Sequence, residues 1–263
     1  MTESVAVLGP AGTFSEQAAK RMYPLARIEY LSDVGDVFEY VADGRGDGVA
    51  ALENSLEGSV DKTMESLLKY DLKIVAEATL DIRLHMMAKK GVKREDVKVI
   101  VSHPHVFGQC KEYLDKNFPK AKKTNTSSTA EAIIEASDRA DAAAIGFREA
   151  GLRYGLHVLA ENIQDQDSQT RFIALSKSAR EGPKTSLIFS TKDEPGALFS
   201  IMKLFADESI NLTKIESRPS RKKLGEYVFY LDYENNSMKA QEREQLHARI
   251  NERTTYFKDL GSY

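Results

Sequence analysis

The feature that most constrains the fold of this chain is a change of pattern after residue 175. Before it, short apolar runs alternate with small polar turns and helical patterns; after the polar segment Ser176–Lys184, a new series of strand and helix patterns begins. We therefore expect two domains, at residues 1–178 and 185–263, with Thr170-Arg171-Phe172 closing the first. A chain of 263 residues, 41% apolar and 29% charged, is long enough for one large and one small domain.

Buried-strand patterns in the first domain end in small polar residues. Val5–Leu8 leads into a Gly-Pro-Ala-Gly turn, Val49–Leu52 leads into Glu53–Val60, and Val97–Val101 leads into a Ser-His-Pro turn. Open α/β sheets bind ligands at the carboxyl ends of their strands. We expect βα units in two lobes around a shared cleft, with the second lobe at about residues 80–158.

The first glycine-rich turn is followed by Thr13-x-x-Glu16, and Ser128-x-x-Glu131 occurs later in the domain. Both match the capping box that begins a helix. Free backbone N–H groups at a helix start favour a bound anion above the first strand. A tight turn without a ligand explains the glycines equally well.

The second domain reads as βαββαβ, the ferredoxin-like order. The elements are a strand at 185–190, an amphipathic helix from about 197, strands at 211–217 and 227–233, a helix at 238–249 and a strand at about 254–260. The edge of such a sheet is available for pairing with a second copy, so we expect a homo-oligomer through this domain. Pro195-Gly196 either leaves N–H groups for a carboxylate or simply opens the helix.

Composition restricts the partners. A net charge of −3 argues against a nucleic-acid surface, and no apolar run approaches a membrane span, so a small molecule is favoured. The N-terminal segment lacks the features of a signal peptide, which predicts a cytoplasmic location. His103 and His105 stand two apart with no carboxylate beside them in the sequence, and Cys110 is the only cysteine. We expect no metal, no other cofactor and a buried structural thiol.

Five ordered blocks together resemble prephenate dehydratase. They are Gly9–Glu16, Glu53–Val60, Ser102–Pro104, Tyr154–Leu156 and Thr170–Phe172. In the second domain, Gly196–Leu198 and Glu216–Pro219 resemble the phenylalanine-binding motifs of the ACT-type regulatory domain. The resemblance covers essentially the whole chain.

The resemblance implies an α/β catalytic domain with two lobes, like periplasmic binding proteins, followed by an ACT domain. It implies conversion of prephenate to phenylpyruvate with loss of water and CO2, and inhibition by L-phenylalanine. Thr170 is then the expected catalytic group at the leaving hydroxyl. The expected substrate-binding residues are Arg171, Phe172, Asn54, Ser55, Thr13, Ser102 and His103. The expected effector-binding residues are Gly196, Ala197, Leu198, Asn211, Glu216, Ser217 and Arg218.

Three positions depart from the family pattern, and two other functions stay open. Ala51-Leu52 replaces Pro-Ile, His105 replaces Gln, and Ser168 replaces an Asn whose loss could alter substrate hydrogen bonding. His103 is either an acid or orienting group or a strand-end imidazole bonded to the backbone. The alternative functions are a related dehydratase that acts on arogenate and a non-catalytic two-lobed sensor.

Overall fold

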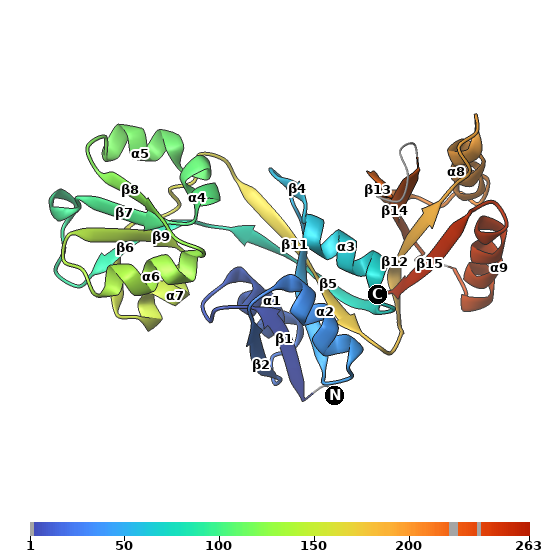
Figure 1. The fold of residues 1–263 in the computed structure, drawn as a ribbon, viewed down its shortest axis with the longest axis horizontal. Helices are drawn as coiled ribbons and strands as arrows, with labels where there is room; N and C mark the ends of the chain where they lie inside the picture. Colours follow the sequence, from blue (N-terminus) through green and yellow to red (C-terminus); the bar gives the residue numbers. More distant parts are fainter. Residues whose placement is uncertain (1–2, 221–225, 236–237) are drawn as a thin grey trace. The chain divides into compact units, whose positions relative to one another are not determined.

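The computed structural model describes residues 3–220, 226–235 and 238–263. Figure 1 shows the helices and strands of the chain, and contacts between residues divide them into two units. The first extends to Met64 and resumes over Ala78–Ile173; the second contains Glu65–Glu77 and Ala174–Tyr263. Helix α3 (Asp61–Lys69), strand β5 (Lys73–Ile82) and strand β11 (Ser168–Ser176) therefore each belong partly to both units. The domain boundaries at 178 and 185 stay predictions.

The first sheet has the order β2-β1-β3-β11-β5, and the short strand β4 pairs with β3. Strand β1 is parallel to both β2 and β3, and Val5, Ala6 and Val7 on it are fully buried, as its apolar run predicts. The strands are β1 Ser4–Leu8, β2 Arg27–Leu31, β3 Asp47–Asn54, β4 Gly58–Ser59, β5 Lys73–Ile82 and β11 Ser168–Ser176. The accompanying helices are α1 Phe14–Met22, α2 Val34–Ala42 and α3 Asp61–Lys69.

The second sheet has the order β10-β6-β9-β7-β8. The chain enters it after β5 and leaves it before β11, as expected for the second lobe of a two-lobed domain. Its strands are β6 His85–Lys89, β7 Val99–Ser102, β8 Lys122–Asn125, β9 Ala142–Gly146 and β10 Leu156–Ala160. Its helices are η1 Arg94–Asp96, α4 Pro104–Gln109, α5 Lys111–Asn117, α6 Thr129–Ser137 and α7 Arg148–Arg153.

The four-stranded sheet of the second unit is antiparallel and has the order β13-β14-β12-β15. This confirms the ferredoxin-like order. The elements are β12 Arg180–Ser190, α8 Ala197–Asp207, β13 Leu212–Pro219, β14 Tyr227–Glu234, α9 Ala240–Asn251 and β15 Tyr256–Ser262. Phe189, Phe205 and Tyr233 are fully buried between the sheet and the helices.

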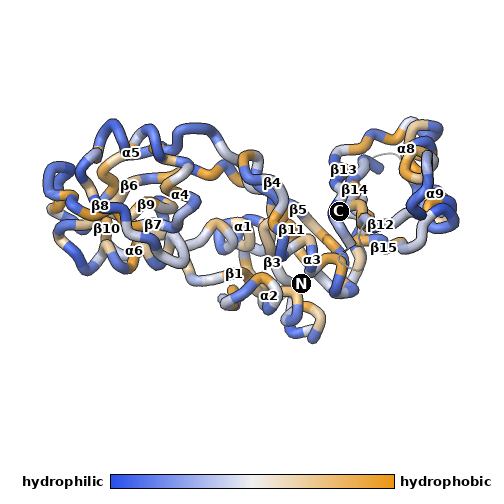
Figure 2. Tube along the Cα trace, turned by 45° about the horizontal axis from the view of Figure 1, so that its top comes forward, coloured by the Kyte–Doolittle hydropathy of each residue, from blue (hydrophilic) through white to orange (hydrophobic). Residues whose placement is uncertain are grey.

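The distribution of hydrophobic and hydrophilic residues agrees with this arrangement of strands and helices. Figure 2 shows hydrophobic stretches along the strands, whereas α9 is drawn mainly in hydrophilic colours. Only one side of α9 is buried, through Leu246, His247 and Ile250. No helix in the described part of the chain is both long and apolar enough to cross a membrane.

The sequence patterns missed some elements and misplaced others. The sequence after the Ser-His-Pro turn predicts one helix around Gln109 to Asn117, but the structure has two helices, α4 and α5, which meet at Cys110. Strands β2 and β8 were not predicted, because their exposed, charged sequences carry little apolar pattern. The expected linker 176–184 is shorter than predicted, because β12 already begins at Arg180 and pairs there with Ser262.

Candidate active site

The side-chain amide of Asn54 joins the end of β3 to the beginning of β11. Its Nδ2 donates to Ser168 Oγ at 2.8 Å and to Thr170 Oγ1 at 2.9 Å. Its Oδ1 accepts from the backbone N–H groups of Leu56 at 2.9 Å and Glu57 at 3.2 Å. Because backbone N–H groups require an acceptor, the orientation of this amide is determined and both hydroxyls face its NH2 group.

The Thr170 hydroxyl therefore accepts one defined hydrogen bond, from the side-chain amide of Asn54. It is 8% exposed, and since successive side chains of a strand alternate, Ser168, Thr170 and Phe172 share one face of β11. The Oγ1 atom accepts from Asn54, so its own hydrogen is left to donate to another group. A polarised hydroxyl donor on a buried strand suits the protonation or hydrogen bonding of a leaving group.

A cavity of about 960 Å³ includes this face of β11. Its walls come from the β1–α1 turn, the end of β3, helix α4, the segment before α6 and β11. Among the residues proposed from the sequence, those that line it are Thr13, Asn54, His103, Thr170 and Phe172. Ser55, Ser102 and Arg171 are not among the lining residues.

Two of these three support the cavity wall through the backbone. Ser55 exchanges hydrogen bonds with Gln169: its N–H donates to the Gln169 carbonyl at 2.8 Å, and its Oγ accepts from the Gln169 N–H at 3.0 Å. Ser102 is fully buried, and its hydroxyl donates to the Ile145 carbonyl at 2.8 Å. Both serines thus tie strand ends together.

Arg171 follows Thr170 and so lies on the opposite face of β11. Its Nη1 is 3.1 Å from Glu53 Oε1, and its side chain is only 11% exposed. Glu53 immediately precedes Asn54 on β3. The ion pair therefore holds β3 and β11 together beside the Asn54 bridge.

Glu57 contacts both His105 and Gln109 on the cavity wall, which the sequence did not predict. Glu57 Oε1 accepts from Gln109 Nε2 at 3.0 Å and lies 3.0 Å from His105 Nδ1. All three residues line the cavity. The sequence feature that could have predicted this contact is the spacing of His105 and Gln109, which are four residues apart and so share one face of α4.

His103 caps α4. Its Nδ1 accepts from the His105 N–H at 3.4 Å, and the two imidazole rings stack with centroids 5.2 Å apart. Burial lowers the pKa of His103 the most, and the neighbouring His105 lowers it further. Glu57 opposes this shift. Of the two roles considered for His103, the observed hydrogen bond is that of an imidazole bonded to the backbone. Its position on the cavity wall also leaves it available to a ligand.

The glycine-rich turn before α1 already holds an anion, which is the carboxylate of Glu16. Thr13 accepts from the Glu16 N–H at 3.4 Å, as a capping residue should, but the carboxylate accepts from Gly12 N–H at 2.5 Å rather than closing a capping box. Arg153, 3.1 Å away, and Lys20 also bind it. Burial acts to raise the pKa of Glu16, but these hydrogen bonds outweigh it and lower the pKa to about 2.

Neither a metal centre nor a reactive thiol is evident in the part of the chain that the structure describes. No group of three or more His, Cys, Asp or Glu side chains is arranged there to hold a metal ion. Cys110 is fully buried, and burial, with a further contribution from Asp165, raises the pKa of its thiol to about 12. Such a thiol is a packing group.

The predicted effector residues lie in separate parts of the second unit. Gly196 is the N-cap of α8 with φ of 83°, and the Ala197 N–H donates to the Glu194 carbonyl at 3.2 Å. Glu216, Ser217 and Arg218 lie on the edge strand β13.

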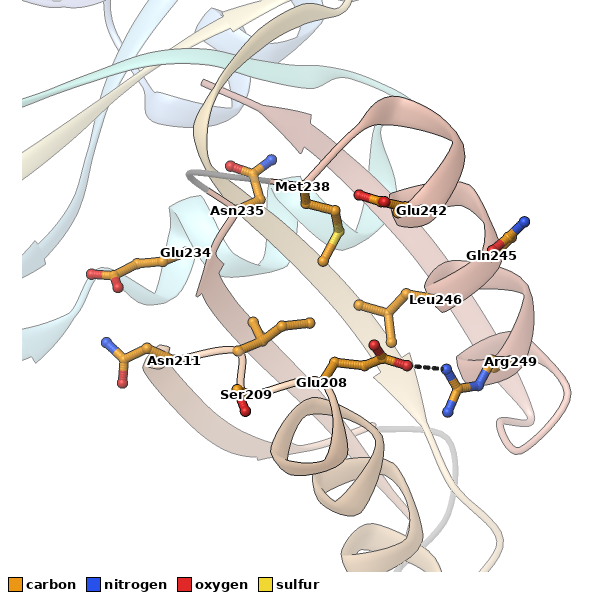
Figure 3. A pocket seen from close by; sticks show the side chains of 11 residues that line it. Glu208, Ser209, Asn211, Glu234, Asn235, Met238, Glu242, Gln245, Leu246 and Arg249 are labelled. Carbon is orange, nitrogen blue, oxygen red and sulfur yellow. Dashed lines mark hydrogen bonds and ion pairs between the residues drawn. The ribbon is translucent and has the colours of Figure 1, made fainter.

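Asn211, which follows the other end of α8, lines a second cavity of about 490 Å³ (Figure 3). In Figure 3, Asn211 and Glu234 lie on one side of this cavity, opposite Leu246 and Arg249 of α9. An ion pair of 2.6 Å joins Glu208 to Arg249 at its lower side.

Comparison with known proteins adds an independent finding. The family model described as "Prephenate dehydratase" matches residues 5–180, and the model described as "ACT domain" matches residues 185–251. A prephenate dehydratase of Methanocaldococcus jannaschii is 38% identical, over 100% of this chain and 98% of its own length. The arogenate dehydratase/prephenate dehydratase 2 of Arabidopsis thaliana is 35% identical, over 98% of this chain and 72% of its own length. The crystal structure of an Arthrobacter aurescens prephenate dehydratase in complex with L-Phe is 32% identical, covers 98% of this chain and 89% of that one, and has a TM-score of 0.88.

Proposed function

This chain belongs to the prephenate dehydratase family, and from that premise we propose that it converts prephenate to phenylpyruvate with Thr170 as its catalytic group. The reaction takes up one proton and releases water and CO2 from the prephenate dianion. The ring hydroxyl leaves as water while the ring carboxylate leaves as CO2, and the ring becomes aromatic. Aromatisation supplies the driving force, so the protein must orient the substrate and assist departure of the hydroxyl.

The observation that carries this proposal is the hydrogen bond from Asn54 to Thr170. A threonine hydroxyl is too weak an acid to protonate a leaving group unaided. Donation from Asn54 into Oγ1 polarises the hydroxyl and strengthens its own donation, because hydrogen bonds in series reinforce one another. The low exposure of Thr170 reduces competition from water at the same atom.

We assign substrate binding to residues on the cavity wall. Thr13, Asn54, His103 and Phe172 line it directly, and Lys62, which lies 3.4 Å from Asp33, contributes a positive charge to the same wall. Ser55 and Arg171 act indirectly in this proposal, by holding Gln169 and Glu53 in place. Ser102 likewise supports the end of β7.

Arogenate is the alternative substrate, and its ammonium group would require a carboxylate in the cavity. Glu57 and Asp33 line the cavity, but Glu57 already contacts His105 and Gln109, and Asp33 accepts from the Gly35 N–H at 2.6 Å and pairs with Lys62. These existing partners favour prephenate.

Regulation by L-phenylalanine is proposed through the second unit, acting as a homo-oligomer. Gly196 and Asn211 stand before and after α8, an 11-residue helix about 16 Å long. One amino acid cannot contact both ends of this helix within one chain. A second copy paired through β13 would bring the Gly196–Leu198 turn of one chain to the Asn211 and Glu216–Arg218 region of the other. The cytoplasmic location stays a prediction.

Incubation of the purified protein with prephenate and, separately, with arogenate tests the activity. We expect phenylpyruvate, measured by its absorbance in alkali, with a higher kcat/KM for prephenate. Faster formation of phenylalanine from arogenate would reassign the substrate. Tight binding of prephenate without product would instead support the non-catalytic sensor.

A further inference from the structure

Lys258 on β15 binds the carboxyl-terminal end of α3. Its Nζ donates to the Leu67 carbonyl at 2.7 Å and to the Tyr70 carbonyl. The last carbonyl groups of a helix lack partners within the helix, and a cation there also interacts favourably with the helix dipole. Burial lowers the pKa of this lysine, with Asp71 opposing and Lys73 adding to the shift, so the ammonium has lost water to make the contact.

Neighbouring contacts within the second unit join the segment after α3 to β12 and β15. Lys73 Nζ donates to the Asp259 carbonyl at 2.6 Å, and Lys184 Nζ lies 2.5 Å from Glu77. Gly261 has φ of 105°, and a Cβ there would be 2.9 Å from the Ile74 carbonyl oxygen. Residues 65–77 therefore pack closely against β12 and β15, although they are distant in sequence.

The other end of α3 is attached to the candidate active site. The buried Thr63 hydroxyl donates to the Ala51 carbonyl on β3 at 2.6 Å, and the Val60 N–H donates to the Leu52 carbonyl at 2.8 Å. Ala51 lines the cavity, and β3 ends at Asn54, the partner of Thr170. One helix thus contacts β15 at its end and the active-site strand at its beginning.

We propose that Lys258 is a positioning residue that couples effector binding in the second unit to the active site, by setting the position of α3. A change in β15 is passed through the Leu67 and Tyr70 carbonyls to a nine-residue helix, and from Thr63 to β3 and Asn54. The helix moves as a unit because its backbone is internally hydrogen-bonded. This inference rests on the proposed function, since it presumes inhibition by phenylalanine. The proposed route does not pass through the segment 176–184, of which Arg180–Lys184 are part of β12.

The test compares Lys258→Met with the wild type and with Lys203→Met. Methionine keeps most of the aliphatic stem but cannot donate to the two carbonyls. Lys203 is exposed and pairs with Asp207 on its own helix at 2.6 Å, so its variant controls for the lost charge. For each protein, phenylalanine affinity is measured by calorimetry, and kcat/KM for prephenate is measured with and without saturating phenylalanine.

We expect Lys258→Met to bind phenylalanine with nearly unchanged Kd, while the factor by which phenylalanine lowers kcat/KM falls about threefold or more. Lys203→Met should keep the full factor, and Lys258→Arg, which retains charge and donors, should restore most of it. An unchanged factor in Lys258→Met would overturn the coupling role and leave the proposed activity standing. A wild type that phenylalanine does not inhibit would overturn both this inference and the proposed regulation.

Hydrogen exchange of the wild-type protein provides a second test if Lys258→Met does not fold. Phenylalanine should change the exchange of amides in the last turn of α3, which includes Leu67. Unchanged exchange in α3, in a protein that phenylalanine inhibits, would also overturn the proposal.

Discussion

The amide of Asn54 donates to the hydroxyl of Thr170 across 2.9 Å, although the two residues are 116 positions apart in the sequence. The same NH2 group donates to Ser168 at 2.8 Å. Two hydroxyls thus share one donor, but only Thr170 lines the cavity. This difference allows the catalytic proposal to be tested with a matched pair of variants.

Replacement of Thr170 by Ala should lower kcat about 10²- to 10⁴-fold with little change in KM, because the hydroxyl is proposed to act mainly in the transition state. Ser168→Ala removes the neighbouring acceptor of the same amide and should change kcat less than about tenfold. Steady-state kinetics with prephenate measures both. Near-normal kcat in Thr170→Ala, or equal losses in the two variants, would contradict the assignment.

Glu16 should make the stability of the protein depend on acid pH. The pKa of its carboxyl falls from an ordinary value of 4.5 to about 2 in the folded protein, so the folded state binds fewer protons than the unfolded state between these values. The stabilisation is therefore present above pH 4.5 and is lost as pH falls toward 2. Glu16→Gln should lower the free energy of unfolding at pH 7 by roughly 1.5–3 kcal/mol and flatten the acid slope. Urea unfolding at several pH values measures this, with Glu208→Gln, from an exposed ion pair, as the control.

Gly196→Ala should weaken inhibition by phenylalanine. The position has φ of 83°, where a side chain is strained, so the turn and its N–H groups should shift. Gly91→Ala is a matched control, because Gly91 also has positive φ, of 95°, and no atom within 4 Å of an added Cβ, but lies in the first unit. We expect the half-inhibitory phenylalanine concentration to rise about tenfold or more only in Gly196→Ala. If the half-inhibitory concentration rises equally in both variants, or in neither, the Gly196 turn is not part of the effector site.

Ile215→Lys should dissociate the proposed oligomer. Ile215 is 47% exposed on the edge strand β13, where a charge opposes strand pairing between copies. Ile134→Lys is the control, because Ile134 is 40% exposed in the first unit. Sedimentation equilibrium should show a lower mass for Ile215→Lys alone. If its mass equals that of the wild type, association does not depend on this edge.

Phenylalanine and a non-reacting substrate analogue should weaken each other's binding by the same factor, because coupling between two binding equilibria is reciprocal. Calorimetry of phenylalanine with and without the analogue measures this factor. Unchanged phenylalanine affinity, in a protein that phenylalanine inhibits, would confine its effect to the chemical step.

Truncation at residue 178, the expected end of the first domain, would be a poor test of regulation. Leu67, Leu72 and Ile74 are almost fully buried and belong to the segment grouped with the second unit. Removal of β15 would take away Lys258 and its contacts with the end of α3. Point variants in the full chain separate loss of regulation from loss of stability.

The sequence by itself determined the local features of this protein. The spacing of apolar residues predicted the βα units and the βαββαβ order. Apolar residues recur at these spacings because each strand or helix buries one or both of its faces. The ordered motifs predicted the family, and Thr13, Asn54, Thr170 and Phe172 do line one cavity.

Only the tertiary structure decided which side chains meet. The family resemblance assigned Arg171 to substrate binding, and the glycine-rich turn left an anion site open beside Gly12, but Arg171 pairs with Glu53 and Gly12 with Glu16. The contact of Lys258 with Leu67 joins residues 191 positions apart. The periodicity of a sequence shows which face of its own strand or helix a residue occupies. It carries no information about the hydrogen-bond or ion-pair partner that a distant segment supplies. That partner is chosen when the sheets and helices pack, because buried polar groups must then be satisfied by whichever groups the fold brings within reach.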